Sequence, residues 1–171
     1  MLGLPKGKVF LAPWDEKWED EYNIEKDLIL ELIGKYVVNC HHIGSTAVKG
    51  LSAKPIIDIA IEIYSFENGY NCVEKLSTIG YKHRILKELP ERHYFSKGGD
   101  LRTHQIHMFQ TGSIYLKKHI VFRDCLIENE TLRKEYQMIK EKDAEEHSTN
   151  KLAYTDAKTE FINEVLKKYG L

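Results

Sequence analysis

The run Lys-Pro-Ile-Ile-Asp-Ile-Ala-Ile-Glu-Ile-Tyr at residues 54–64 constrains the fold more than any other stretch of the chain. It is nearly all apolar, and strand geometry places alternate side chains on opposite faces. One face consists of isoleucines, namely Ile57, Ile59, Ile61 and Ile63. The other face is mixed and consists of Ile56, Asp58, Ala60 and Glu62. We therefore predict a central strand, in which a buried Asp58 must be hydrogen-bonded, paired or bound to a metal.

Strand and helix patterns alternate around this strand until the chain becomes helical. Apolar runs predict further strands at residues 8–13, 37–44 and, after a Gly-Gly-Asp turn, 102–110. Apolar stripes at helical spacing predict helices at residues 15–36 and 65–80, and again from about residue 113 to the C-terminus. We expect one α+β domain over residues 1–171, with a helical part over about 113–171.

Composition and charge exclude several classes of protein. The 171 residues include 25 basic and 26 acidic side chains, so there is no electrostatic case for general binding to nucleic acid or to a membrane surface. No apolar run approaches the ~20 residues of a membrane span. The first residues lack the apolar region of a signal peptide, and three widely spaced cysteines are typical of reduced thiols. We expect a cytoplasmic protein.

The Gly44-Ser45-Thr46 turn, at the end of the predicted strand 37–44, is the main candidate for anion binding. Successive backbone N–H groups in such a turn bind phosphate, the two hydroxyls add donors, and glycine permits close approach. Twelve residues separate Ser45 from Asp58, so the two can meet at one edge of a sheet. Phosphate on the turn with Mg²⁺ on Asp58 is one reasonable combination. The alternative is that Asp58 caps a local backbone or pairs with Lys54.

Residues 42–59, HIGSTAVKGLSAKPIIDI, resemble the signature of the GrpB family, whose fold is similar to that of the nucleotidyltransferase superfamily. Further similarity extends over roughly the whole chain, in LAPWDEKW, GYKHR, RHYFSKG, THQIHMF, FRDCLIENETLRKEYQMIKEKDA and YTDAKTEFI. The resemblance implies a nucleotidyltransferase-like mixed β-sheet flanked by helices. It also implies a Gly-Ser turn that holds nucleotide phosphates and a metal-binding acid at Asp58.

The chain departs from the catalytic pattern of active nucleotidyltransferases. Those enzymes place two carboxylates in an Asp-x-Asp/Glu arrangement and a third on another strand, so that two metals can be held. Here Ala60 occupies the second position. Glu62 shares the face of Asp58 but lies about 13 Å away along a strand that rises ~3.3 Å per residue. The strand 102–110 carries no acid, which leaves a one-metal arrangement at Asp58.

Histidines and basic residues complete the predicted site. His107 is the candidate catalytic partner of Asp58, as a metal ligand or general base, although a packed or surface histidine is the plainer alternative. Arg92 and Lys97 are expected to neutralise phosphates, unless they are ordinary surface charges. The full predicted phosphate-binding set is His42, Gly44, Ser45, Thr46, Lys54, Arg92 and Lys97. The charged run 140–146 is expected to be a solvated helix face.

Three functions fit these residues. The first is transfer of a nucleotidyl group from a nucleoside triphosphate to a small molecule with Mg²⁺ on Asp58, against which the missing carboxylates count. The second is binding of a nucleotide or another phosphate-bearing small molecule by a fold that has lost catalysis. The third is a different phosphate-ester reaction in which histidines act as acid and base. The first is the leading hypothesis, and the second is its main alternative.

Overall fold

The computed structural model describes residues 1–146 and 153–171, and its strands and helices alternate before the chain becomes helical. The strands are β1 (Leu4–Pro5), β2 (Val37–Ile43), β3 (Ile57–Ile63), β4 (Lys82–Arg84), β5 (His93–Lys97), β6 (Leu101–Arg102) and β7 (His104–Gln110). The helices are α1 (Lys17–Ile33), α2 (Asn68–Ser77), α3 (Ile114–Glu128), α4 (Glu130–Glu146) and α5 (Ala153–Lys167). A short 3₁₀ turn, Ser45–Ala47, follows β2.

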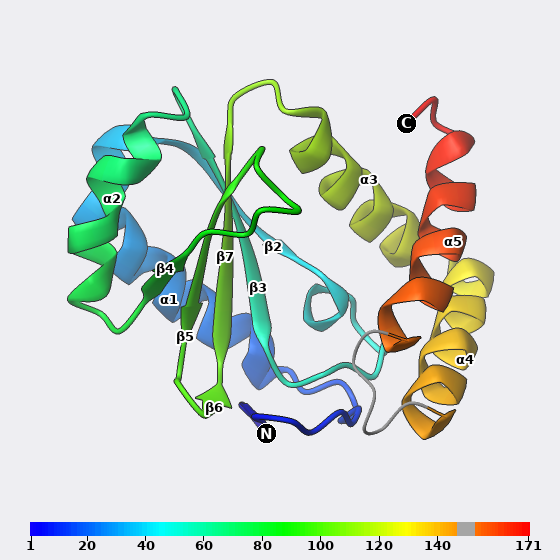
Figure 1. Cartoon of the computed structure of the whole chain (residues 1–171). Coiled ribbons are helices and arrows are strands. Elements are labelled where there is room, and N and C mark those ends of the chain that lie inside the picture. The colour runs from blue at the N-terminus through cyan, green and yellow to red at the C-terminus, as the bar shows by residue number, and fades with distance from the viewer. Residues whose placement is uncertain (147–152) are drawn as a thin grey trace.

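The main sheet has the strand order β2-β3-β7-β5-β4 (Figure 1). β3 and β7 are parallel, whereas the other neighbouring strands are antiparallel, so the sheet is mixed. Asp58 in β3 lies between Ile43 of β2 and Gln105 of β7. β1 and β6 form a separate two-stranded sheet. These findings confirm the predicted α+β fold with a mixed sheet and a helical C-terminal part.

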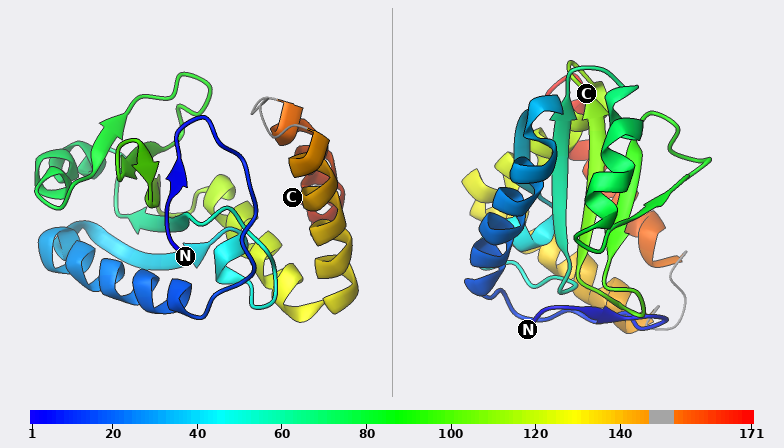
Figure 2. Two further views of the ribbon diagram at one scale, coloured as in Figure 1. Left: turned by 90° about the horizontal axis from the view of Figure 1, so that it is seen from below. Right: turned by 90° about the vertical axis from the view of Figure 1, so that its left-hand side faces the viewer.

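The two faces of the sheet are covered by different helices. The isoleucines of β3 pack with Trp18, Ile29 and Ile33 of α1 and with Leu76 of α2, and burial of this apolar area is the main source of stability here. On the other face, Ala60 packs with Phe109 and with Leu116 of α3. Figures 1 and 2 show α1 and α2 on one side of the sheet and α3, α4 and α5 on the other.

Helices α3, α4 and α5 form a lobe with its own aromatic core. Tyr136 of α4 stacks on Phe161 of α5 with ring centroids 5.5 Å apart, and Phe122 of α3 meets both rings edge-on. The lobe is hydrogen-bonded to the chain between β2 and β3. Gln137 accepts a hydrogen bond from the Ser52 amide, and Lys140 donates one to the Ser52 carbonyl. No helix in the described ranges is both long and apolar enough to cross a membrane.

Two local predictions are wrong. Residues 8–13 do not form a strand, because the only ladder contact there is an isolated bridge from Ala12 to Ala53. The run 140–146 is not wholly solvated, since Lys140 is 1% exposed and Asp143 is 3% exposed. Both side chains face inward because α4 packs against the loop before β3 and against α5.

Candidate functional site

The Gly-Ser turn and Asp58 meet, as the spacing between them predicts. β2 ends opposite Asp58, so Gly44 begins the turn directly beside that carboxyl group. Gly44 has a φ of +72°, a conformation that side-chain-bearing residues rarely adopt. A Cβ atom at Gly44 would lie 2.7 Å from Asp58 Oδ2. Backbone conformation and close approach therefore both require glycine at this position.

Thr46 and His42 stabilise the turn through hydrogen bonds. Thr46 is buried, and its hydroxyl shares a 2.9 Å hydrogen bond with His42 Nε2 and donates to the Ile56 carbonyl over 3.4 Å. The His42 ring stacks on Tyr22 with centroids 4.6 Å apart. Burial, helped by the nearby Arg123 guanidinium, lowers the pKa of His42 to about 4. His42 is therefore neutral near pH 7 and supports the turn from outside the cleft described next.

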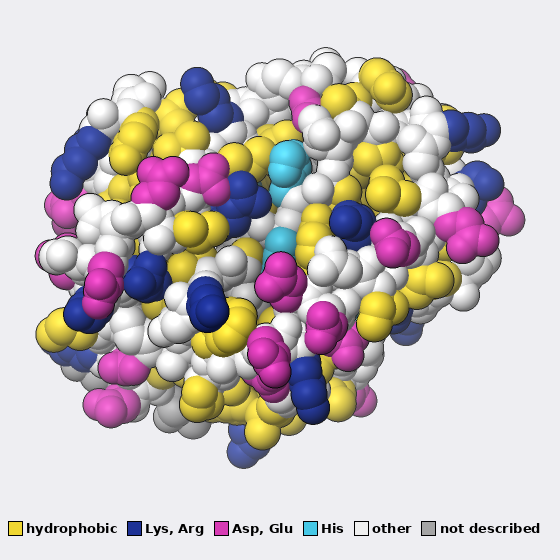
Figure 3. All heavy atoms as spheres, turned by 180° about the vertical axis from the view of Figure 1, so that it is seen from behind, with side chains coloured by type: hydrophobic (Ala, Val, Ile, Leu, Met, Phe, Trp, Pro, Cys, Tyr) yellow, Lys and Arg dark blue, Asp and Glu magenta, His cyan; other side chains and the backbone are white. Residues whose placement is uncertain are grey.

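A cleft of about 840 Å³ opens at the turn, and its lining is strongly basic. The walls come from the N-terminal segment, β4, β6, the chain before β3, and helices α4 and α5. Figure 2 shows the N-terminal segment (dark blue) crossing one end of the sheet. The basic lining residues are Lys6, Lys8, Lys54, Lys82, Arg84, Arg102, Lys140 and Lys158. The acidic lining residues are Asp58 and Asp100. By contrast, acidic and basic side chains are interspersed on the face seen in Figure 3.

Asp58 lies among these cations with 30% of its side chain exposed. The protein around the rest of the carboxyl group partly desolvates it, and this burial raises the pKa of Asp58 to about 7. Lys158, Lys54 and Arg102 oppose this rise, because their positive charges favour the carboxylate. Asp58 is therefore poised between its acid and its carboxylate form near neutral pH, as a general base or acid would need to be.

His107 lies behind Asp58, on the neighbouring strand and on the same face of the sheet. Its Nε2 is 3.9 Å from Asp58 Oδ1, and its ring centroid is 5.2 Å from that of Tyr94, which lines the cleft. Burial lowers the pKa of His107 to about 3, with further contributions from His119 and Arg92. His107 is thus neutral and does not itself line the cleft.

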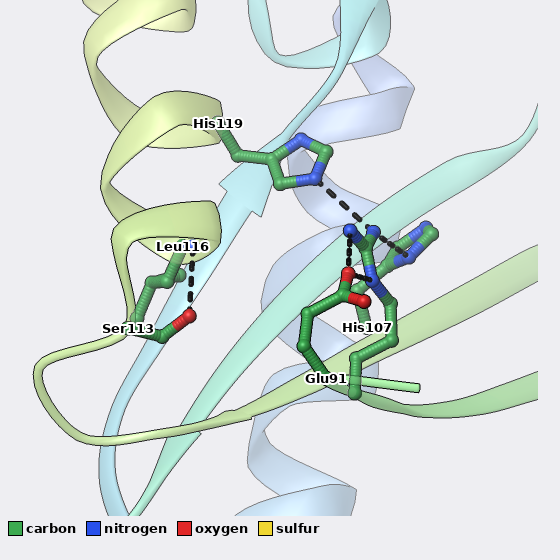
Figure 4. Close-up of polar contacts among 6 residues, drawn as sticks. Glu91, His107, Ser113, Leu116 and His119 are labelled. Atoms are coloured by element: carbon green, nitrogen blue, oxygen red, sulfur yellow. Dashed lines mark hydrogen bonds and ion pairs between the residues drawn. The ribbon is translucent and has the colours of Figure 1, made fainter. Parts of the chain in front are cut away.

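Arg92 and Lys97 are not brought to the cleft. The Arg92 guanidinium lies between His107 and His119 and pairs with Glu91, as Figure 4 shows for the three labelled partners. Lys97 points to the opposite face of the sheet, where its ammonium lies 2.8 and 3.0 Å from the two carboxylate oxygens of Glu25. Gly44, Ser45, Thr46, Lys54 and Asp58 are the predicted site residues that the structure does gather.

The residues around Asp58 do not form a donor set for a pair of magnesium ions. Glu62 is engaged at the far end of β3, where it accepts hydrogen bonds of 2.6 Å from Thr111 and 3.1 Å from Asn39. Within residues 1–146 and 153–171, no three His, Cys, Asp or Glu side chains form a group that could hold a metal ion. In the described part of the chain, the charged side chains that act on Asp58 are Lys158, Lys54 and Arg102.

Most of the basic lining was not predicted from the sequence. Lys6, Lys8, Lys82, Arg84 and Lys140 lie in segments that are far apart in the chain and meet only in the folded structure. Lys82, Arg84, Lys140 and Lys158 fall within segments that resemble the GrpB family, and Arg102 lies beside one, but the resemblance did not assign any of them to the phosphate-binding set. Lys6 and Lys8 lie outside these segments.

Comparison with known proteins assigns the chain to a family. The family model for GrpB protein matches residues 8–168. The glutamate-rich protein GrpB of Alkalihalophilus pseudofirmus is 35% identical, over 98% of this chain and 99% of its own length. UPF0157 protein YqkA of Bacillus subtilis is also 35% identical over 92% of this chain, which spans only 46% of that protein's length.

Solved structures agree with this assignment. The crystal structure of the conserved protein GrpB from Enterococcus faecalis superposes with a TM-score of 0.86 at 27% identity, and covers 95% of this chain and 100% of that one. Cid1, described for its RNA terminal uridylyl transferase activity, gives a TM-score of 0.55 at 11% identity over 79% of this chain and 42% of that one, which shows a shared fold alone. The chain belongs to the GrpB family and has a nucleotidyltransferase-like fold.

Proposed function

We propose that this protein binds a nucleotide or another phosphate-bearing small molecule in the cleft beside the Gly44-Ser45 turn. The observation that carries the proposal is the charge of the cleft. Among the residues that the structure describes, eight basic side chains and two carboxylates line it, in a chain whose formal net charge is -1. Its volume of about 840 Å³ falls in the range of small-molecule sites. The nucleotidyltransferase-like fold favours a nucleotide among the phosphate-bearing ligands.

Within this proposal, both the Gly44-Ser45 turn and the neighbouring lysines bind the phosphate groups of the ligand. Gly44 permits close approach of an anion to the backbone, and Ser45 lines the cleft next to it. Lys54 and Lys158 approach Asp58 closely enough to influence its titration, so they lie near the same point. An anionic ligand there would offset the mutual repulsion of the cations.

Nucleotidyl transfer to a small molecule is a second candidate, favoured by the raised pKa of Asp58 beside the turn. An acceptor hydroxyl or amine would attack the α-phosphorus of a nucleoside triphosphate. The bond to the bridging oxygen would break, pyrophosphate would leave, and Asp58 would take the acceptor's proton. Basic side chains would stabilise the leaving group. The predicted Mg²⁺ at Asp58 stays a prediction, and none of these steps depends on it.

Calorimetric titration tests the binding proposal. ATP, GTP and inorganic pyrophosphate would be titrated into the native protein, Lys54→Met and Lys49→Met. Lys49 is the matched control, because it is an exposed lysine of the same loop that does not line the cleft. We expect Lys54→Met to weaken binding about tenfold, or about 1.4 kcal/mol, and Lys49→Met to leave it unchanged. The absence of binding to all three probes, or equal losses in both variants, would contradict the proposal.

A turnover assay separates transfer from binding alone. Pyrophosphate release from ATP would be followed across a panel of hydroxyl and amine acceptors, with MgCl₂ and with EDTA, in the native protein and Asp58→Asn. Acceptor-dependent release that disappears in Asp58→Asn supports transfer. Binding of ATP without release in any condition supports the binding function and rejects transfer.

A further inference from the structure

A half-buried cluster behind Asp58 joins Glu91, Arg92, His107 and His119. The Arg92 side chain is only 7% exposed and lies over the Phe109 ring, 4.7 Å from its centroid. Its Nε donates to Glu91 Oε1 over 2.7 Å, which fixes the plane of the guanidinium. One terminal nitrogen, NH1, lies 3.3 Å from both His107 Nδ1 and His119 Nε2 (Figure 4).

The chemistry of arginine settles which ring nitrogens carry protons. A guanidinium has N–H donors and no acceptor, so any nitrogen that hydrogen-bonds to it must present a lone pair. Nδ1 of His107 and Nε2 of His119 are therefore both unprotonated. With both rings oriented as in the structure, these contacts fit neutral histidines in opposite tautomers, with protons on His107 Nε2 and on His119 Nδ1. They do not fit an imidazolium, which carries protons on both nitrogens.

We infer that Arg92 is a positioning residue that holds His107 in the Nε2–H tautomer, with this proton directed toward Asp58. His107 Nε2 faces Asp58 Oδ1 across 3.9 Å, and a small movement of either side chain would close this gap to a hydrogen bond. In this role His107 is a fixed donor to the carboxylate of the cleft. It is not a proton acceptor on that side, so in the transfer reaction proposed above, on which this step rests, Asp58 is left to serve as the base. The lowered pKa values of both histidines agree with their neutral state.

Long-range ¹H–¹⁵N correlation spectra of ¹⁵N-histidine-labelled protein at pH 7.5 test this inference directly. Each tautomer gives its own pattern of nitrogen shifts, and His107→Gln and His119→Gln identify the two rings. In the ligand-free native protein we expect a pure Nε2–H pattern for His107 and a pure Nδ1–H pattern for His119. An imidazolium, a tautomer mixture, or the reverse tautomer at His107 would overturn the inference.

Arg92→Met then tests whether the guanidinium of Arg92 is what fixes the tautomers of His107 and His119. We expect both rings in this variant to become tautomer mixtures. Arg133→Met is the matched control, because Arg133 donates to the carbonyls of Leu126 and Ile127 and to no histidine among its hydrogen bonds; its spectra should keep the native tautomers. A lower melting temperature in Arg92→Met with unchanged tautomers would show a purely structural role. None of these readouts needs a ligand, so they stand apart from the outcome of the nucleotide titrations.

Discussion

Gly44 lies so close to Asp58 that the addition of a single methyl group there should disturb the candidate site. We predict that Gly44→Ala destabilises the protein by about 1–3 kcal/mol and weakens pyrophosphate binding. The reasons are the φ of +72° and the 2.7 Å approach of the new Cβ to Asp58 Oδ2. Gly50→Ala is the control, because Gly50 has a φ of +82° but no atom of the described residues within 4 Å of an added Cβ. Urea unfolding and calorimetry should show similar backbone strain in both variants, and loss of affinity in Gly44→Ala alone.

Asp58 should lower the free energy of unfolding as the pH rises from about 4 to about 7. Its pKa is about 7 in the folded protein and near the ordinary value of 3.8 when unfolded. Between these values the folded state binds a proton that the unfolded state does not, so the free energy of unfolding decreases with pH. We predict that Asp58→Asn gains stability over the native protein between pH 4 and pH 8, by about 1 kcal/mol or more. Urea unfolding across this range measures the difference, and a constant difference would contradict it.

The positions of single residues relative to one another were predictable where the determinants are local in the chain. Gly44, Ser45 and Asp58 are joined by one turn and one adjacent strand, so their spacing was enough to predict that they meet. Lys97 was predicted to bind phosphate because it is basic and lies near the expected site. Its partner Glu25 is 72 residues away, and nothing near Lys97 in the sequence indicates that pairing. Sequence pattern and local spacing cannot predict long-range ion pairs of this kind.

At the scale of elements, the ion pair between Lys97 and Glu25 attaches α1 to β5. The Glu25 side chain is 5% exposed, so removal of its partner leaves a buried carboxylate uncompensated. Because Lys97 is itself 26% exposed, we predict that Lys97→Met costs about 1–3 kcal/mol of stability, the cost of leaving a buried polar group unsatisfied. We also predict that Glu25→Gln/Lys97→Met recovers part of this loss and that ATP affinity is unchanged. A double-mutant cycle in urea measures the coupling. Weaker ATP binding in Lys97→Met would instead support its predicted phosphate-binding role.

The elements themselves were predictable where side-chain alternation is strong. β3 carries isoleucine at every second position, β7 has an apolar centre that follows the predicted Gly-Gly-Asp turn, and both strands form as expected. Residues 8–13 look like a strand because they are apolar. They form none because no neighbouring strand offers a partner beyond Ala53, and sheet structure needs pairing rather than propensity.

At the scale of the whole molecule, the basic cleft exists only because the sheet and the helical lobe meet. Lys54 belongs to the sheet side, Lys140 and Lys158 to the lobe, and Lys6 and Lys8 to the N-terminal segment. Net charge is a sum over the chain, so a value of -1 hides this local surplus. The prediction that charge gives no case for general nucleic-acid binding remains compatible with a basic site of small-molecule size.

Lys140 connects the helical lobe to the chain before β3 through its hydrogen bond to Ser52. The ionisation of Lys140 should therefore make the stability of this contact depend on pH. Burial, with the nearby Lys158 and Lys54, lowers its pKa to about 7 in the folded protein, although Glu141 acts in the opposite direction. Between pH 7 and the ordinary lysine value of 10.5, the unfolded state binds a proton that the folded state does not. The free energy of unfolding therefore rises with pH over this range, whereas below pH 7 the folded state carries a buried ammonium.

We predict that the stability of the native protein relative to Lys140→Met rises by about 1 kcal/mol or more between pH 7 and pH 9.5. Urea unfolding at several pH values measures this difference, and subtraction of the variant cancels the other groups that titrate in the same range. Lys142→Met is the control for loss of a lysine from α4, because Lys142 is exposed on the same helix. A difference that stays flat with pH would mean that Lys140 remains charged at the junction, with its ammonium held there by the Ser52 carbonyl and the Tyr136 ring.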